Sequence, residues 1–506
     1  MKAIGVIGVW AVLLTTSTVT FSQASAEADV DGPYVPRAEY ERLQQAFEEL
    51  KQQVQQIQQQ QVSQTAAHGR LPVTPTPKGL DLLPAGELTP GWERVRAPGW
   101  MGPGHLERMS ARIARAGEMD LYMGLDTVGR FQWLSQGHVA DTVGSDSTLS
   151  GPLSPGFQTA YGNFSFLADF EQDMEVYFNV FIADSPHPDK LQGDEGYLLI
   201  RRLPDSLGET PRLRSLFDNV DIKAGQFELD FGDAHYRRSL NAAVQHNPLI
   251  GNYVVDPRAA EIGLELSSDE GRFPVNWLIG GGSGGEAQDF QKNHALSLHG
   301  KLWGHPVERL RTSSSIYWVD HSDTPTSSRT NMFRTNRSGG AYAGVLDNGI
   351  SPGDVFPVAG QHVLATQFDA TWEDDPVELY GHLGWVQDSD NNGDTSGTPR
   401  SSWFYYATEG IYHFTDRLYA AARYSGASAL RLVSAASSSR DVNSGGLVHR
   451  IQLGGGYWLT KTVLTKLEYV YQLYNGFDAS GSQVSGVDAW LDPSFHGVLA
   501  EVSFAF

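Results

Sequence analysis

Residues 495–506 read Phe-His-Gly-Val-Leu-Ala-Glu-Val-Ser-Phe-Ala-Phe. Apolar residues occupy every second position of this stretch, and smaller or more polar residues stand between them. The apolar set is Val498, Ala500, Val502, Phe504 and Phe506. Because side chains alternate along a β-strand with a period of two, this set shares one face of a predicted strand.

The stretch 463–474 repeats the pattern more strongly. One face carries Leu467, Tyr469, Tyr471 and Leu473, and the other carries Lys466, Glu468 and Gln472. An apolar face opposite a charged face is typical of a membrane β-barrel strand, with lipid outside and water inside. The alternative is a strand of a soluble sandwich with one face on a core. The terminal residues Val502, Phe504 and Phe506 resemble the assembly signal that outer-membrane proteins present to the barrel-assembly machinery.

Composition narrows the class of protein. The chain has 506 residues, no Cys and a formal net charge of −22. The acidic balance argues against a nucleic-acid partner, and the missing Cys excludes disulfides and thiolate metal sites. No apolar run of about 20 residues follows the first segment, so a helical membrane protein is not expected.

The first quarter of the chain reads as three segments ahead of the barrel. Residues 1–26 are expected to be a signal peptide, with Lys2 before an apolar core and a small-residue cleavage site at its end. Residues 37–62 carry apolar residues at spacings of three and four, which predicts a periplasmic coiled coil; a solvated helical spacer is the alternative. Residues 63–116 form a Pro-rich linker, with one short helix expected over 105–116.

Strand patterns fill residues 117–506 and predict an all-β, sixteen-stranded antiparallel transmembrane β-barrel. The expected strands are 119–135, 160–170, 174–183, 195–202, 219–231, 258–266, 273–282, 294–304, 311–320, 362–373, 376–387, 402–414, 417–427, 448–459, 463–474 and 495–506. Short and long connections alternate along this series, with one exception at 203–218. Short periplasmic turns and long external loops are typical of a barrel, and a soluble sandwich has no reason to alternate in this way. Sixteen strands are wide enough to leave an aqueous channel.

The stretch 220–266 carries the most specific signal for function. It contains Gly225-Gln226-Phe227, then Phe231-Gly232 and a basic loop with Arg237 and Arg238 before the return strand. This order resembles the phosphate-selective porin O/P family. The resemblance implies a trimeric channel of sixteen strands per subunit whose third external loop folds inward to narrow the pore. Counted by length, the third long connection here is 232–257.

The predicted function is passive diffusion of small hydrophilic solutes through an outer-membrane porin, with a lean towards anions such as phosphate. Arginine suits oxyanions because its planar fork donates two hydrogen bonds at once. The candidate constriction residues are Arg237, Arg238, His235 and Asp233. The candidate pore-lining residues are Lys223, Lys301, Arg423, Arg450, Lys466, Glu261, Glu409 and Glu468. Because acids share these faces, the two arginines could instead pair with carboxylates and only hold the loop.

Two chemical motifs and two other functions remain as alternatives. Gly281-Gly282-Ser283-Gly284-Gly285 matches the nucleophile-elbow pattern of a hydrolase, but it leads into another strand and not into a helix. Asp388, Asp390 and Asn392 match the first half of a calcium loop, although Pro399 stands where the bidentate Glu is expected. A solvated Asn/Asp loop is the alternative there. A structural barrel tethered through its coiled coil is the second functional hypothesis, and an outer-membrane hydrolase is the third. The expected partners are outer-membrane lipid and two further copies of the chain, with no cofactor, no metal and no enzymatic activity.

Overall fold

A computed structural model describes residues 111–116, 119–140, 148–158, 160–170, 174–182, 191–201, 220–239, 244–258, 260–268, 275–284, 295–320, 332–333, 342–345, 353, 355, 362–389, 400–431, 446–460, 462–475 and 490–505. The predicted signal peptide, coiled coil and the linker as far as residue 110 lie outside these residues. Those three predictions therefore stay predictions.

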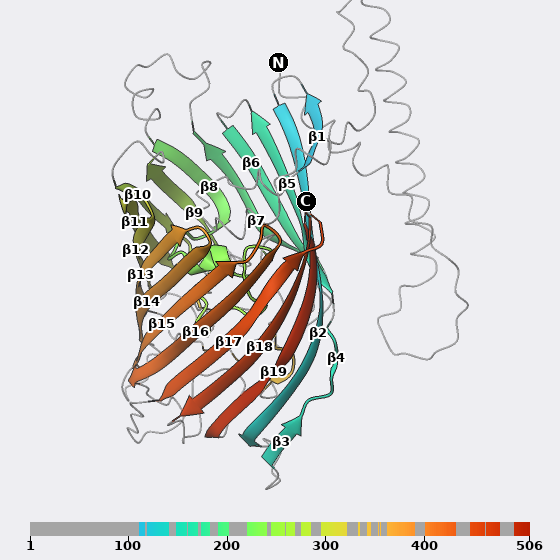
Figure 1. Ribbon diagram of the computed structural model, residues 1–506. Coiled ribbons are helices and arrows are strands. Elements are labelled where there is room, and N and C mark those ends of the chain that lie inside the picture. Colours follow the sequence, from blue (N-terminus) through green and yellow to red (C-terminus); the bar gives the residue numbers. More distant parts are fainter. Residues whose placement is uncertain are drawn as a thin grey trace, which may run out of the picture. The chain divides into compact units, whose positions relative to one another are not determined.

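The described residues form one antiparallel sheet that closes on itself into a barrel (Figure 1). Its strands are β1 Ala111–Ala116, β2 Met119–Ala140, β3 Thr148–Pro152, β4 Gly156–Phe157, β5 Tyr161–Phe170, β6 Met174–Ile182, β7 Leu191–Ile200, β8 Val220–Glu228, β9 Ala260–Ser268, β10 Asn276–Gly282, β11 Leu296–Val307, β12 Leu310–Asp320, β13 His362–Asp374, β14 Val377–Ser389, β15 Arg400–His413, β16 Leu418–Arg431, β17 Leu447–Trp458, β18 Val463–Asn475 and β19 Trp490–Ala505. Three of these strands, β1, β3 and β4, pair only with β2. The other sixteen complete the ring, which confirms the predicted strand number.

The ring closes where β19 pairs with β2, from Ala505 opposite Asp126 to Trp490 opposite Val139. Strand β2 is longer than the stretches that pair with it, so it extends past β19 at its start and past β5 at its end. Strand β1 pairs with one overhang, and β3 and β4 pair with the other. These short strands satisfy backbone groups that an unpaired edge would expose.

One prediction is wrong where strand β1 lies. The helix expected over 105–116 is wrong for Ala111–Ala116, which are extended and pair with β2. A single helix of about twelve residues is marginal without packing partners. The overhang of β2 offers ready hydrogen bonds to an extended segment, and this tertiary pairing overrides the helical spacing of the sequence.

The two faces of the sheet have opposite character, as the alternation predicts. On β18 the outward Leu467 is 60% exposed, whereas the neighbouring Glu468 points inward and is fully buried. On β19 the outward Val502 is 52% exposed and the inward Glu501 is 2% exposed. Large exposed hydrophobic side chains occur on fourteen of the sixteen strands of the ring, from Trp133 on β2 and Val176 on β6 round to Val502 on β19. The barrel is therefore apolar outside and polar inside.

Two connections occupy the interior of the barrel. The described residues of the first, 229–239 and 244–258, are named here the first inward segment, and they include the single-turn helix η2 at Ala234–Arg237. In Figure 1 this segment, drawn in green, lies within the ring of strands. The second inward segment comprises the described residues of the connection between β12 and β13, namely Met332, Phe333, 342–345, Gly353 and Val355. Both contribute buried hydrophobic residues to one cluster with the wall.

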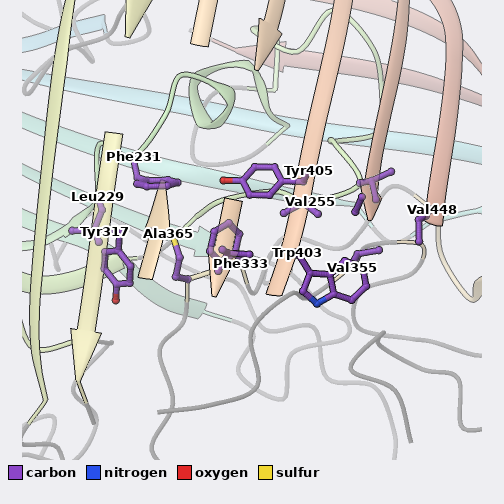
Figure 2. Packing of buried hydrophobic residues seen from close by; sticks show 14 of the residues in the cluster. Leu229, Phe231, Val255, Tyr317, Phe333, Val355, Ala365, Trp403, Tyr405 and Val448 are labelled. Atoms are coloured by element: carbon purple, nitrogen blue, oxygen red, sulfur yellow. The ribbon is translucent and has the colours of Figure 1, made fainter. Parts of the chain in front are cut away.

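This cluster differs from the open, watered lumen that the sequence predicted. Figure 2 shows Phe231, Val255 and Phe333 gathered against Trp403 and Tyr405 of the wall. The rings of Phe333 and Tyr405 have centroids 5.8 Å apart. Apolar residues in the two connections favour burial over exposure to water, and a wide barrel offers them an interior to enter. The connection 321–361, expected outside the barrel, thus has its described residues inside.

Among the described residues, no helix is long and apolar enough to cross a membrane.

Candidate functional site

The first inward segment is joined to the barrel wall by several groups of contacts, and the first group is next to the end of β8. Asp230 and Asp233 both form ion pairs with Lys301 of β11, and Lys301 Nζ lies 2.8 Å from Asp233 Oδ1. Asp233 also pairs with Arg311 of β12. Burial alone would raise the pKa of Asp233, but the adjacent cations hold that pKa below its usual range. The start of the segment is thereby fixed to β11 and β12.

His235 and Tyr236 lie in η2 beside this ion-pair cluster. The imidazole of His235 packs on the ring of Tyr236, with centroids 3.8 Å apart, and its Nε2 lies 3.7 Å from Asp230 Oδ1. Burial lowers the pKa of His235 below its ordinary value, although neighbouring carboxylates oppose the shift. A buried His with a lowered pKa is neutral near pH 7, so it adds no fixed positive charge here.

Arg237 makes the second attachment, to strands β14 and β15. Its Nε donates to Glu409 Oε1 at 2.9 Å, its Nη1 donates to Glu378 Oε1, and its guanidinium lies 4.8 Å from the centre of the Tyr380 ring. Glu409 accepts a further hydrogen bond from Arg423 Nε at 2.6 Å. One wall carboxylate therefore lies between two guanidinium groups, of which one belongs to the inward segment.

Arg238 points elsewhere and does not share these partners. Its Nη2 lies 2.7 Å from Asp256 Oδ2, and Asn252 Nδ2 donates to the same oxygen at 3.1 Å. This ion pair joins the start of the first inward segment to its end. The two arginines that the sequence placed together at a constriction are thus both buried and both paired with acids, and their place at a constriction stays a prediction.

The third attachment is to strands β18, β19 and β2. Lys466 Nζ donates to the carbonyl oxygen of Val244 at 2.8 Å and lies 2.8 Å from Glu501 Oε1. Arg130 Nε lies 2.7 Å from the other oxygen of Glu501. Glu468 Oε2 accepts from the backbone N–H of Ile250 at 2.6 Å. The middle of the segment, at Val244 and Ile250, is therefore bound to the wall on the side where the ring closes.

The remaining predicted lining residues also face inward. Lys223 of β8 lies 4.4 Å from the centre of the Phe227 ring and 3.9 Å from Glu265 Oε1. Glu261 of β9 accepts from Tyr317 Oη at 2.7 Å. Arg450 of β17 contacts both inward segments. All eight predicted lining residues are buried in the interior, and their role in lining a pore stays a prediction.

Several residues of the site were not predicted from the sequence. Arg130, Arg311 and Glu378 form ion pairs with or beside the first inward segment. Each occupies an inward position of a predicted strand, so strict alternation alone could have identified them. The second inward segment was also missed, although Met332, Phe333 and Tyr342 are large apolar residues in a Gly- and Ser-rich connection.

The structure describes only some residues of the predicted assembly-signal, calcium and hydrolase motifs. Val502 and Phe504 point outward on β19 as predicted, and Phe506 lies outside the described residues. Asp390 and Asn392 also lie outside them, and Asp388 is buried on β14. Ser283 follows β10 and donates its backbone N–H to Ile262 of β9 at 3.0 Å. In the described part of the chain no group of three or more His, Asp or Glu residues is placed to hold a metal ion.

Comparisons with known proteins do not assign the chain to a family. No family model matches it, and no curated protein matches it. Among solved structures, the outer-membrane expressed OmpT of Vibrio cholerae aligns over 78% of this chain and 99% of its own, at 9% identity and a TM-score of 0.43. Salmonella typhi OmpF, in a complex with daunomycin, aligns over 77% and 98%, at 12% identity and a TM-score of 0.45. Similarity of this strength says nothing about function, and the resemblance to the phosphate-selective porins stays a prediction.

Proposed function

We propose that the chain is an outer-membrane porin for passive diffusion of small hydrophilic solutes. The observation that carries this proposal is the reversal of polarity around the ring, with Leu467 and Val502 exposed outside and Glu468 and Glu501 buried inside. Large exposed apolar residues on nearly every strand of the ring form a surface that soluble monomers rarely present. Lipid is the environment that suits such a surface, and a closed barrel leaves no unpaired edge within it.

The first inward segment is the proposed constriction. It crosses the interior between attachments on β11–β12, on β14–β15 and on β18–β19, so a solute must pass beside it. Its charges are mixed, because Arg237 and Arg238 are each paired with carboxylates. Fixed charge of either sign near a narrow passage selects ions by raising the local concentration of the opposite sign. The anion preference that the sequence suggests therefore depends on how completely these carboxylates neutralise the arginines.

The proposed setting is the bacterial outer membrane, with residues 37–62 in the periplasm holding three copies of the chain together. The support is the apolar seam of 37–62, which one helix cannot bury alone. If that role is correct, deletion of 37–62 weakens the trimer in mild detergent. Trimers of unchanged stability would reject it.

A structural barrel remains a second candidate, because the apolar cluster of Phe231, Phe333 and Trp403 fills part of the interior. In that case the inward segments are packing elements and the barrel conducts nothing. The proposed porin conducts through the space beside them.

The test is the conductance and reversal potential of the full-length protein in a planar bilayer under a KCl gradient. Stepwise currents support the porin, and their absence from folded protein moves the assignment to the structural barrel. An anion-selective current that weakens in Arg237→Ala/Arg238→Ala supports the anion preference and the constriction together. A cation-selective current keeps the porin and rejects the anion preference.

A further inference from the structure

The two inward segments touch each other inside the barrel. The backbone N–H of Val355 donates to the carbonyl oxygen of Val254 at 2.8 Å. Gly251 lies so close to Tyr342 that a Cβ at position 251 would collide with the tyrosine hydroxyl. One segment therefore contributes the surface against which the other packs, although about a hundred residues separate them in the sequence.

Arg450 of β17 holds both segments with one guanidinium group. Its Nη1 donates to the carbonyl oxygen of Asn252 at 2.8 Å, and its Nη2 donates to that of Gly353 at 2.6 Å. The guanidinium also lies 4.9 Å from the centre of the Tyr342 ring. Arg450 is completely buried. Withdrawal of either segment would leave a buried charged donor without its acceptor, which is unfavourable in a dry interior.

Glu468 of β18 repeats this arrangement with the opposite charge. Its Oε2 accepts from the backbone N–H groups of Ile250 at 2.6 Å and Gly251 at 2.9 Å, which belong to the first inward segment. Its Oε1 accepts from Tyr342 Oη of the second at 2.8 Å. A cation and an anion on adjacent strands thus each bridge the same two segments.

The contact at Gly353 leaves little freedom for the second segment. Gly353 has a φ of 80°, which favours glycine. A Cβ there would lie 2.8 Å from the ring of Phe495 and 3.1 Å from Arg450 Nη2. The carbonyl that Arg450 binds is therefore fixed both by backbone conformation and by close packing.

We propose that the two inward segments form a single plug, which enters and leaves its buried position as one unit, and that Arg450 is the residue that positions it. This proposal rests on the proposed channel function and extends it, because the plug then sets the width of the conducting path. Coupling follows from the shared partners: displacement of one segment removes hydrogen-bond acceptors or donors that hold the other.

The chain has no Cys, so a single engineered thiol reports on the plug without background labelling. Val254→Cys monitors the first segment and Val355→Cys monitors the second, since both positions are fully buried. Each is placed separately into the full-length protein in detergent, with and without Arg450→Ala. Maleimide labelling rates and single-channel conductance are then measured. Arg309→Ala is the matched control, because Arg309 is 59% exposed and pairs with Asp374 at the turn between β11 and β12.

In the Arg450→Ala background we expect both thiols to label faster, by about tenfold or more, as loss of a charge-assisted hydrogen bond implies. The open-pore conductance should rise, and Arg309→Ala should change neither. Arg450→Lys keeps the charge but lacks the fork that binds two carbonyl groups. It should therefore resemble Arg450→Ala if bridging, and not charge alone, positions the plug.

Three results would overturn the proposal. If only Val355→Cys becomes accessible, the segments move independently, and if neither does, Arg450 does not position them. Faster labelling with no change in the conductance of an active channel would show that the plug does not set the conducting path. Should Arg450→Ala fail to fold, Arg450→Lys tests the role of Arg450, and Gly251→Ala, which displaces Tyr342, tests the coupling of the two segments. Labelling needs no current, so a barrel that never conducts contradicts the channel function and leaves the coupling test intact.

Discussion

Arg237 of the first inward segment and Glu409 of β15 form a buried ion pair, with Arg237 Nε and Glu409 Oε1 2.9 Å apart. Both side chains are at most 2% exposed. Glu409 also binds Arg423 of β16 through its other oxygen. Removal of this one carboxylate leaves two guanidinium groups close together with Glu378 as the acid that remains beside Arg237.

We expect Glu409→Gln to shift the reversal potential of the channel towards anions. The substitution removes one negative charge next to the proposed constriction and keeps the size of the side chain. Two unit charges about 4 Å apart in water interact with an energy of about 1 kcal/mol. That energy corresponds to roughly a fivefold change in the ratio of anion to cation permeability. Glu308→Gln, at an exposed turn, is the control and should leave the reversal potential unchanged. Equal reversal potentials for wild type and Glu409→Gln would remove Glu409 from the permeation path.

The barrel itself could be predicted from sequence because its signal is local. Alternation of Leu467 with Lys466 and Glu468 reports which face each residue occupies, whatever the neighbouring strands do. All sixteen ring strands follow from such patterns. Strand ends were less predictable: β2 runs on to Ala140 and pairs there with β3, which no pattern in the predicted 119–135 announces.

The interior could not be derived in the same way, because it depends on contacts between distant residues. Arg237 finds Glu378 and Glu409, which lie more than 140 residues along the chain. Nothing in the local spacing of Arg237 and Arg238 distinguishes a free constriction charge from a paired one. The second inward segment has the same difficulty, since Phe333 becomes a buried residue only once Phe231 and Tyr405 are beside it.

Because the outer face of the barrel is apolar, a charged side chain placed on it should lower the stability of the protein in lipid. The loss should depend on how deep in the bilayer the charge lies. Leu467→Arg should lower the free energy of unfolding in lipid. The expected loss approaches about 2–4 kcal/mol, which is the cost of an Arg at the bilayer midplane. Thr465→Arg, two residues nearer the start of the same strand and on the same face, should cost less, because the cost falls to about 0–1 kcal/mol near the interface. Urea titrations of protein refolded into vesicles measure both. Equal costs at the two positions would contradict a lipid-facing surface on β18.

The pKa of Asp233 predicts how the attachment of the first inward segment responds to acid. Its pKa in the folded protein is held below the ordinary value of 3.8 by Lys301 and Arg311, despite burial. A carboxyl with a depressed pKa stabilises the folded state fully above its unfolded pKa, and this contribution is lost as the pH falls through the folded pKa. The segment should therefore stay attached at pH 5 to 7 and loosen only below about pH 4.

Hydrogen exchange of the backbone in 229–239 measures this attachment, with wild type and Asp233→Asn compared at each pH so that intrinsic exchange cancels. At pH 6 we expect Asp233→Asn to exchange about a hundredfold faster or more, since breaking a buried ion pair costs about 3–5 kcal/mol. Below the folded pKa of Asp233 the two proteins should converge, because the wild-type carboxyl is then protonated. Backbone amides of β18, which pairs with β17 and β19 in the barrel wall, provide the internal control. A ratio that stays constant from pH 6 to pH 2 would show that the charge of Asp233 does not hold the segment.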